Sequence, residues 1–357
     1  MPDSSSAATV LDDLPEWLVV EEILVRLPTK DVLRCRAVRK SWRAGTSTDK
    51  FILDHHRRQP SLPIIQHMQG IYCLAAAGDQ RIRPVLRYTP PCAVLTFRVS
   101  HQAACDGLLI VSREYSSYIC NPATRKCASL PHPPTRHDQP SALQIVGFYR
   151  HHVSGEHRVI WMLEYYRASL SPDFFVLTVG SDHPRRIQWP EDSARWFRLC
   201  SRYPGHSPVH HRGSLHWALN VDITVFDTVT ETFRKMSRPA QLGHMVSLLD
   251  MAGDLALYHL TGDGEIDVWV LRDYDAETWS LQYRIDFLEM EAFPPLNLEV
   301  KGIRSVAVIN ERELLIKHYP DRLLHCDIDG VFLGNVESVE RQFGLSLTGY
   351  HFQESIV

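Results

Sequence analysis

The sequence predicts a mainly β protein with a small α-helical unit at its N-terminus and a β-propeller of about six blades after it. Apolar residues spaced by three and four indicate helices within residues 10–58. From residue 59 onward, short β-branched and aromatic runs alternate with Gly, Pro, Asn and Asp turns. A weak repeat of roughly 40 to 50 residues in this second region favours a propeller. We therefore expect domains at 10–58 and 59–357, after a disordered tail over residues 1–9.

The composition is that of a folded, soluble protein. Of the 357 residues, 44% are hydrophobic and 22% are charged, which excludes a disordered or collagen-like chain. The nearest approach to a membrane span, residues 59–78, is uncharged, but Pro60, Pro63 and Gly70 interrupt it well short of about twenty apolar residues. Residues 1–13 lack the basic and apolar regions of a secretory signal. We expect the chain in the cytosol or nucleus.

The cysteines, histidines and net charge exclude several kinds of site. The eight cysteines form no CxxC pair, so we expect reduced thiols and no disulfide framework. The nineteen histidines form no HExxH motif and no Cys/His spacing that gathers ligands on one element, so no metal or other cofactor is predicted. A net charge of −4 gives no bulk attraction to phosphate backbones, which argues against a nucleic-acid partner.

The first helix is predicted from residues on one helical face, Trp17, Val20, Leu24 and Leu27. Pro28 disfavours helical geometry at Leu27 and marks its end. Thr29 is then placed to cap a second helix, and more helix is expected through Trp42. The apolar surface is wider than a small helical core needs, so an outside partner is expected.

The β region contains a repeat in which a glycine precedes a polar turn by fourteen residues. Gly107 is followed at this offset by Asn121, and Gly213 by Asp227. Glu313 and Asp327 keep the same offset without the glycine. An Asn or Asp at such a turn can bond its own backbone two residues on. Each copy therefore indicates strand, strand, polar turn, strand.

The spacing of these turns predicts the number of blades. Turns at 121, 227, 273 and 327 leave one wide gap, which a turn at 180–184 fills, and a further turn lies near 78–79. About six blades follow. Residues 345–352 are predicted to pair beside the first blade and close the ring, which removes the open sheet edges. A β-sandwich with similar hairpins is the alternative, but the recurring offset favours the propeller.

The N-terminal residues closely resemble the F-box motif. The resemblance covers Leu14–Pro28, Val32–Val38 and Lys40–Arg43, which is nearly the whole motif. The sequence departs from the usual pattern at Trp17, Arg39 and Gly45.

Residues 60–357 are similar to the F-box-associated region of the large plant F-box families, whose repeats are similar to kelch or other propeller blades. The most typical piece is Cys105–Leu109 followed by Asn121–Thr124. This second resemblance is diffuse and indicates the architecture more than the ligand.

Together the resemblances imply a non-catalytic substrate receptor of a Skp–cullin–F-box ubiquitin ligase. The F-box would bind a Skp-type adaptor and through it a cullin, and the propeller would hold a protein target. The alternative is that the apolar residues of the F-box form an internal helical core. For Leu24 and Val38 this alternative has the same weight as direct contact with the adaptor. The implied adaptor-facing residues are Leu14, Pro15, Leu18, Ile23, Leu24, Leu27, Pro28, Leu33, Val38 and Trp42.

A basic run in the second and third helices is either a patch for an acidic partner or a solvated face. It comprises Arg34, Arg36, Arg39, Lys40 and Arg43. The substrate site is unknown; the loops with aromatic or arginine residues suited to an interface are 136–138, 195–197, 203–205 and 319–321.

The competing functions are a propeller-type interaction protein outside ubiquitination and a lectin- or glycosidase-like domain. No GxSxG, Walker or GxGxxG motif is present. Residues 261–269 approach an Asp-box turn, but Glu265 occupies the position where glycine is needed. Asp263, Glu265 and Asp267 do not form a calcium loop, since Val268 replaces the required glycine. A hairpin with Asp263-Gly264 at its tip is the simpler interpretation.

Overall fold

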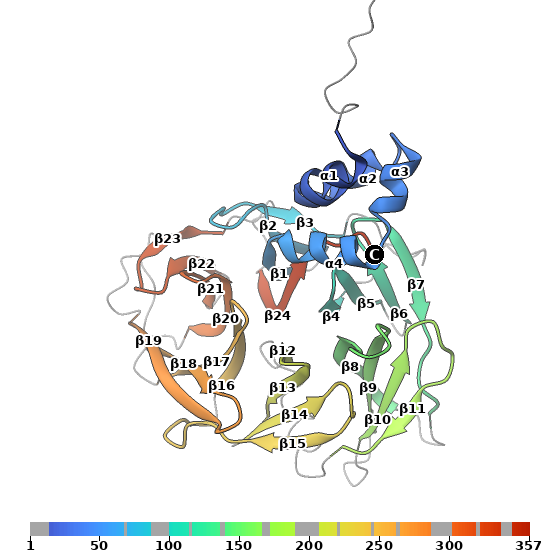
Figure 1. Ribbon diagram of the computed structural model, residues 1–357. Helices are drawn as coiled ribbons and strands as arrows, with labels where there is room; N and C mark the ends of the chain where they lie inside the picture. The colour runs from blue at the N-terminus through green and yellow to red at the C-terminus, as the bar shows by residue number, and fades with distance from the viewer. Residues whose placement is uncertain are drawn as a thin grey trace, which may run out of the picture.

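The computed structural model has helices within residues 16–58 and strands within 61–353 (Figure 1). Among the described residues, no helix is both long and apolar enough to cross a bilayer. The structure describes residues 14–67, 70–86, 100–113, 116–135, 140–165, 172–189, 207–219, 222–243, 246–261, 265–286, 302–318, 322–336 and 345–357. The predicted tail over 1–9 lies outside these ranges.

The first helical segment is continuous but contains a π-helical turn. It runs through α1 (Glu16–Leu18), the π-helix η2 (Val19–Ile23) and the 3₁₀-helix η3 (Leu24–Arg26). Its buried side chains are five residues apart, as the wider π turn requires: Val19 with Leu24, and Val20 with Val25. Trp17 is 61% exposed whereas Val20 and Leu24 are buried, so the residues predicted to share one helical face do not share one environment. The π turn shifts the helical phase on which that prediction depended.

Three further helices complete the helical unit: α2 (Thr29–Cys35), α3 (Lys40–Gly45) and α4 (Asp49–Arg58). The prediction that Thr29 caps α2 is wrong. Thr29 is the first residue of the helix, and Pro28 occupies the N-cap position. Helix α4 was not expected as a separate element. Thr48 is its N-cap and accepts a hydrogen bond from the Phe51 N–H at 3.2 Å.

The strands form six four-stranded antiparallel sheets in a ring, with the first strand of each nearest the centre (Figure 1). This confirms the predicted six-bladed propeller. The blades are β24 (Ser346–Gln353), β1 (Ser61–His67), β2 (Gly70–Leu74), β3 (Ile82–Pro84); β4 (Ser100–Cys105), β5 (Leu108–Arg113), β6 (Ser116–Asn121), β7 (Lys126–Leu130); β8 (Pro140–Arg150), β9 (His157–Tyr165), β10 (Asp173–Thr178), β11 (Arg185–Ile187); β12 (Val209–His211), β13 (Ser214–Ala218), β14 (Ile223–Asp227), β15 (Phe233–Met236); β16 (Val246–Met251), β17 (Asp254–Leu260), β18 (Glu265–Asp273), β19 (Thr278–Asp286); β20 (Ile303–Asn310), β21 (Glu313–His318), β22 (Arg322–Asp327), β23 (Phe332–Asn335).

The last strand closes the ring as predicted. Strand β24 pairs antiparallel with β1, and Phe352 lies opposite Leu62. A strand from the far end of the chain therefore supplies the innermost position of the first blade. The pairing completes the first blade, since without β24 the edge of β1 that faces the centre would be unpaired.

The six predicted polar turns occupy one equivalent position, the connection between the third and fourth strands of each blade. The Asp227 carboxylate accepts hydrogen bonds from the Val229 and Thr230 N–H groups, both at 2.8 Å. Asp273 and Asp327 accept bonds from the residues two positions on. The repeat in the sequence is thus a repeat of side-chain-supported turns.

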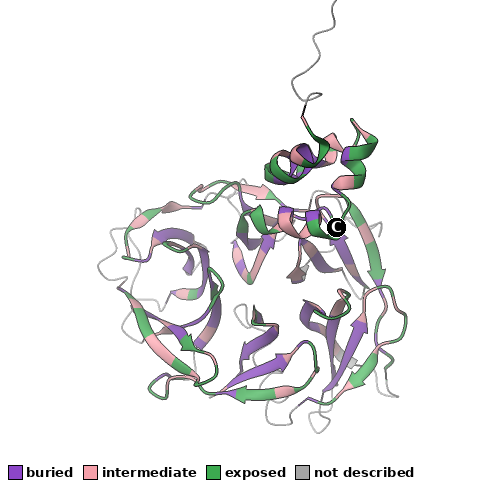
Figure 2. Cartoon of the chain, in the orientation of Figure 1, coloured by how far each residue is buried: buried purple, intermediate pink, exposed green. Residues whose placement is uncertain are grey.

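The apolar cores of the propeller lie between neighbouring blades. Buried residues dominate the middle strands of the blades, and exposed residues are frequent on the outermost strands (Figure 2). Between the third and fourth blades, the Tyr149 and Phe226 rings pack edge to face at 5.7 Å. At the same contact the Trp217 indole N–H donates to the Val146 carbonyl at 3.0 Å. Each blade therefore depends on its neighbours for burial.

One prediction about the cysteines is wrong. Cys120 and Cys127 form a disulfide with a Cα–Cα distance of 4.2 Å, although reduced thiols were expected throughout. They lie directly opposite each other in the β6–β7 ladder. The repeated turn at Asn121 sets this register, so a seven-residue separation brings the two sulfurs together. Cys35, Cys73, Cys105 and Cys326 are free.

Candidate functional site

The residues expected to face an adaptor divide into a buried group and an accessible group. Leu24 is 3% exposed and Trp42 is 7% exposed, so both belong to the interior of the helical unit. Val38 is 67% exposed. For Leu24 the core alternative holds, whereas Val38 is available to a partner. Pro15 and Pro28 are exposed, and the half-buried members are Leu14, Leu18, Ile23, Leu27 and Leu33.

Two of the accessible positions lie at one edge of the helical unit. The Ser41 hydroxyl donates to the Glu16 carboxylate at 3.0 Å, and Arg39 lies 3.6 Å from the same carboxylate. These contacts hold the start of α1 beside the start of α3. Pro15 precedes Glu16 and Val38 precedes Arg39 in the chain, so both lie at this edge. Leu27 follows the opposite end of the helical segment over 16–26, roughly 16 Å away along its axis.

The basic run does not form one continuous patch. Arg36 is half-buried and donates to the Thr46 hydroxyl at 3.0 Å. Arg39 lies over the Trp42 ring at 5.2 Å, and Arg34 pairs with Asp31 at 2.9 Å on the surface. Burial, with a smaller contribution from the Arg43 charge, lowers the pKa of Arg36. Arg36 therefore holds the unit together.

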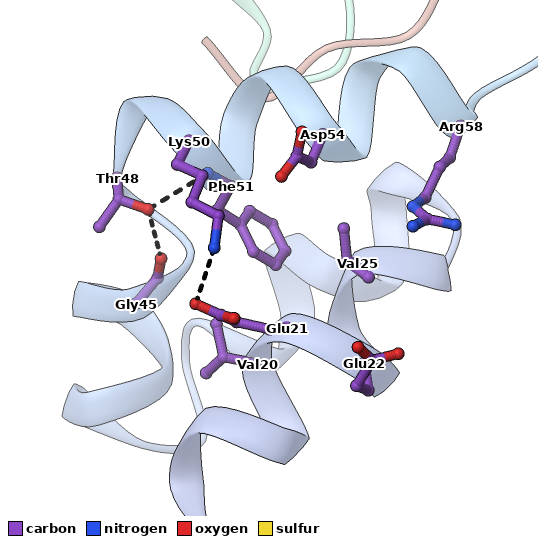
Figure 3. A pocket seen from close by; sticks show the side chains of 10 residues that line it. All are labelled: Val20, Glu21, Glu22, Val25, Gly45, Thr48, Lys50, Phe51, Asp54 and Arg58. Atoms are coloured by element: carbon purple, nitrogen blue, oxygen red, sulfur yellow. Dashed lines mark hydrogen bonds and ion pairs between the residues drawn. The ribbon is translucent and has the colours of Figure 1, made fainter.

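A cavity of about 200 Å³ lies between the first helical segment and α4 (Figure 3). Lys50 pairs with Glu21 across it at 3.2 Å. A side chain at Gly45 would meet Val20 at 3.0 Å, so the glycine allows α3 to approach the first segment closely. The cavity is lined by Val20, Glu21, Glu22, Val25, Gly45, Thr48, Lys50, Phe51, Asp54 and Arg58. Its acidic and basic groups occur together, so it favours neither an anion nor a cation.

The segment after β24, residues 354–357, is called the tail here. Ile356 is 2% exposed and packs in the core of the helical unit with Leu24, Trp42 and Phe51. The chain end lies beside α4 (Figure 1). Sequence analysis missed this contact because the tail and the helical core are about 300 residues apart. The one signal was an Ile-Val pair after the closing strand.

Polar contacts fix the tail to both domains. The Asn121 amide donates to the Ser355 carbonyl at 3.2 Å and to the Val357 carbonyl at 3.0 Å. On the helical side, His56 of α4 bonds the Glu354 carbonyl at 3.0 Å. The tail is therefore held by hydrogen bonds to the second blade on one side and to α4 on the other. Asn121 was predicted only as a turn residue, and its second role depends on tertiary contact.

A cluster of Cys105, Asp106 and His157 lies at the same junction. The side-chain donor atoms of these three residues all lie within 4.8 Å of one another. Burial opposes ionisation of Asp106, but the hydrogen bond from His157 together with the nearby charges of His157, His56 and Arg150 outweighs it and lowers the Asp106 pKa. The three residues come from different elements, so spacing along the sequence gave no signal.

The predicted interface loops and the tip of the suspected Asp-box hairpin lie outside the described residues. These are residues 136–138, 195–197, 203–205, 319–321 and 262–264. Of the acidic residues considered there, Asp267 is 6% exposed and accepts a bidentate hydrogen bond from Arg284 at 2.6 and 2.9 Å. Asp267 is thus engaged in a structural ion pair.

Several plant proteins are similar to this chain over most of its length. F-box protein At4g19940 of Arabidopsis thaliana is 24% identical, covering 84% of this chain and 77% of the relative. F-box protein At2g34280 of the same plant is 25% identical, covering 88% of this chain and 92% of the relative. F-box protein At5g49610 is also 25% identical, covering 84% and 85%.

A family model described as an F-box associated beta propeller domain matches residues 86–313. The matched range extends from the end of the first blade into the sixth. It therefore covers most of the ring and more than half of the chain. The chain belongs to the family of proteins with an F-box associated beta propeller domain.

Proposed function

We propose that the chain is the substrate receptor of a Skp–cullin–F-box ubiquitin ligase. The helical unit binds a Skp-type adaptor and the propeller binds a protein target. The observation that carries the proposal is the combination of an F-box-like unit with accessible apolar residues and a family-matched propeller. A unit of about forty residues rarely stands without a partner, so its exposed apolar edge is a reasonable adaptor surface.

The proposed mechanism needs no catalytic residue in this chain. A receptor raises the concentration of its target near the charged conjugating enzyme, and it needs two binding surfaces in a fixed relation. The tail supports this requirement because it packs in the helical core while Asn121 of the second blade holds it. Sharing a compartment with a cullin places the proposed receptor in the cytosol or nucleus, which a fluorescent fusion tests.

The adaptor surface is tested by Val38→Asp in the full chain. A charge at this exposed position should weaken capture of a purified Skp-type adaptor at least about 30-fold, the effect of losing a hot-spot residue. Val331→Asp is the matched control, because Val331 is also exposed, at 55%, but lies on the propeller. Equal adaptor affinity in the two variants contradicts the proposal.

The receptor role is tested in a reconstituted ubiquitination reaction. Targets are first identified by affinity capture from cells in which the proteasome is inhibited. The Val38→Asp chain should still bind such a target, yet fail to support its ubiquitination. Undiminished ubiquitin transfer, or turnover of a sugar by the chain alone, would require a different function.

A further inference from the structure

The cluster at the junction is built from two neighbouring blades. Cys105 is the last residue of β4, Asp106 occupies the following turn, and His157 begins β9. The Asp106 carboxylate lies 3.1 Å from His157 Nε2. The side chain of Asp106 is 28% exposed and that of His157 is 14% exposed. The group is sheltered but remains open to a small ion.

A second histidine faces the same carboxylate from the helical unit. His56 Nε2 of α4 lies 4.0 Å from Asp106 Oδ1. The other ring nitrogen, Nδ1, is bonded to the Glu354 carbonyl at 3.0 Å. A carbonyl only accepts, so Nδ1 carries the proton and Nε2 of the neutral ring presents a lone pair. In the neutral form of His56 two acceptors therefore face each other, and a bound cation would bridge them.

The hydrogen bond from His56 Nδ1 to a backbone carbonyl is also the outer contact common to metal-binding histidines. Such contacts fix the tautomer and the ring orientation, leaving the other nitrogen for the metal. Here the carbonyl belongs to the tail, which is held in turn by Asn121. The orientation of His56 is thus set before any ion binds.

The turn that carries Asp106 is similarly constrained. Asp106 and Gly107 both have positive φ, 49° and 76°. A side chain at Gly107 would lie 2.5 Å from Ser355 Cβ of the tail, so only glycine fits there. The turn is pressed against the tail, and this restricts the position of the Asp106 carboxylate.

We propose that Cys105, Asp106 and His157 bind a divalent zinc-class ion, with His56 of α4 as the fourth ligand. Zn²⁺ accepts thiolate, imidazole and carboxylate donors in four-coordinate sites, whereas Mg²⁺ and Ca²⁺ require oxygen ligands. Because three ligands belong to the propeller and one to α4, the ion would fasten the helical unit to the ring. This proposal is independent of the receptor function.

The site is tested on the purified full-length chain with Co²⁺ as a spectroscopic probe. After chelator treatment and dialysis, Co²⁺ should bind at one ion per chain. It should produce the near-ultraviolet band of thiolate–Co²⁺ charge transfer and the visible bands of four-coordinate Co²⁺. Zn²⁺ should displace it. A folded wild-type chain that gives neither band overturns the proposal and leaves the Asp106–His157 contact as an ordinary ion pair.

Variants assign the ligands. Cys105→Ser should abolish the charge-transfer band, and Asp106→Asn and His56→Ala should each weaken Zn²⁺ binding at least about 10-fold. The matched controls are Cys326→Ser, which removes a buried cysteine elsewhere, and His351→Asn, which removes another histidine bonded to a backbone carbonyl. Retention of the band in Cys105→Ser, or unchanged Zn²⁺ affinity in His56→Ala, contradicts the assigned ligand set.

Discussion

In the propeller, the apolar cores lie between neighbouring blades, and β24 from the far end of the chain pairs with β1 to complete the first blade. The helical unit does not close on itself in this way. It exposes 61% of Trp17 and 67% of Val38, and it completes its core with Ile356 from the tail. The difference shows which region can stand alone. The blades bury each other's apolar surfaces, whereas the helical unit needs Ile356 of the tail to complete its core and leaves apolar side chains exposed.

Exposed large apolar residues also occur on the described part of the propeller, but their setting differs. Val229 lies at the turn between the third and fourth strands of the fourth blade, and Val331 lies at the equivalent turn of the sixth blade, two residues before the exposed Leu333. Pro15 and Val38 instead lie together at one edge of the helical unit. The pair at the edge of the helical unit brings together two different helices, whereas the propeller residues lie within single turns and strands.

Deleting residues 346–357 should have the largest effect, because it removes both the closing strand and the tail. Opening the ring exposes two sheet edges and part of a blade core. We expect the single cooperative thermal transition to be lost. A chain that keeps its unfolding temperature after this deletion would show that the ring does not depend on β24.

Ile356→Ala should destabilise the helical unit while the ring stays folded. Removing a buried isoleucine typically costs about 2 to 5 kcal/mol. Hydrogen exchange should therefore accelerate within residues 16–58 and remain slow in the blades. Val357→Ala is the control, since Val357 is 47% exposed and should change stability by less than about 0.5 kcal/mol. Equal exchange in the two variants contradicts the dependence on the tail.

Asn121→Asp should loosen the tail by about 1 to 3 kcal/mol, because it replaces an amide donor to two carbonyls with an acceptor. The turn itself should survive, since the carboxylate can still accept from the Thr124 N–H. Asp227→Asn makes the reverse change at the equivalent turn of the fourth blade, away from the tail. Urea unfolding should be clearly more sensitive to the first change than to the second.

Acid should weaken the propeller through a buried neutral histidine. Burial, partly offset by a hydrogen bond to the Val209 carbonyl, lowers the His216 pKa to about 3. The unfolded chain binds a proton near pH 6.5 while the folded chain does not, so this stability is lost as pH falls below 6.5. The loss is about 1.4 kcal/mol between pH 7.5 and 5.5.

The His216 effect is isolated by comparing two variants over this pH range. His216→Asn should lack the loss, whereas His211→Asn should keep it. The same pH dependence in both variants would assign the acid sensitivity to other groups. Burial also lowers the pKa of His55 in the helical unit, so acid should weaken both regions.

The propeller could be predicted from the sequence because its evidence is local. Asn121, Asp227 and Asp327 each bond their own turn, so the repeat along the chain records the repeat in space. The Cys120–Cys127 disulfide was also within reach, since the Asn121 turn places the two residues opposite each other. The expectation of reduced thiols follows from the compartment alone and takes no account of this register.

The junction could not be predicted, because its evidence is not local. The contact of Ile356 with the helical core and the grouping of Asp106 with His56 depend on which blades meet under α4. The separation of Trp17 from the buried residues Val20 and Leu24 has a different cause. No residue pattern indicates the π turn over residues 19–23, and a prediction based on a regular α-helical period cannot include it.

Hydrogen exchange of the full-length chain, with and without a purified Skp-type adaptor, tests the central claim most directly. Adaptor should slow exchange over residues 14–43, including Pro15-flanking positions and Val38, while the blades exchange as before. Protection confined to the blades, or no protection at saturating adaptor, would contradict the assignment of the helical unit as the adaptor-binding region.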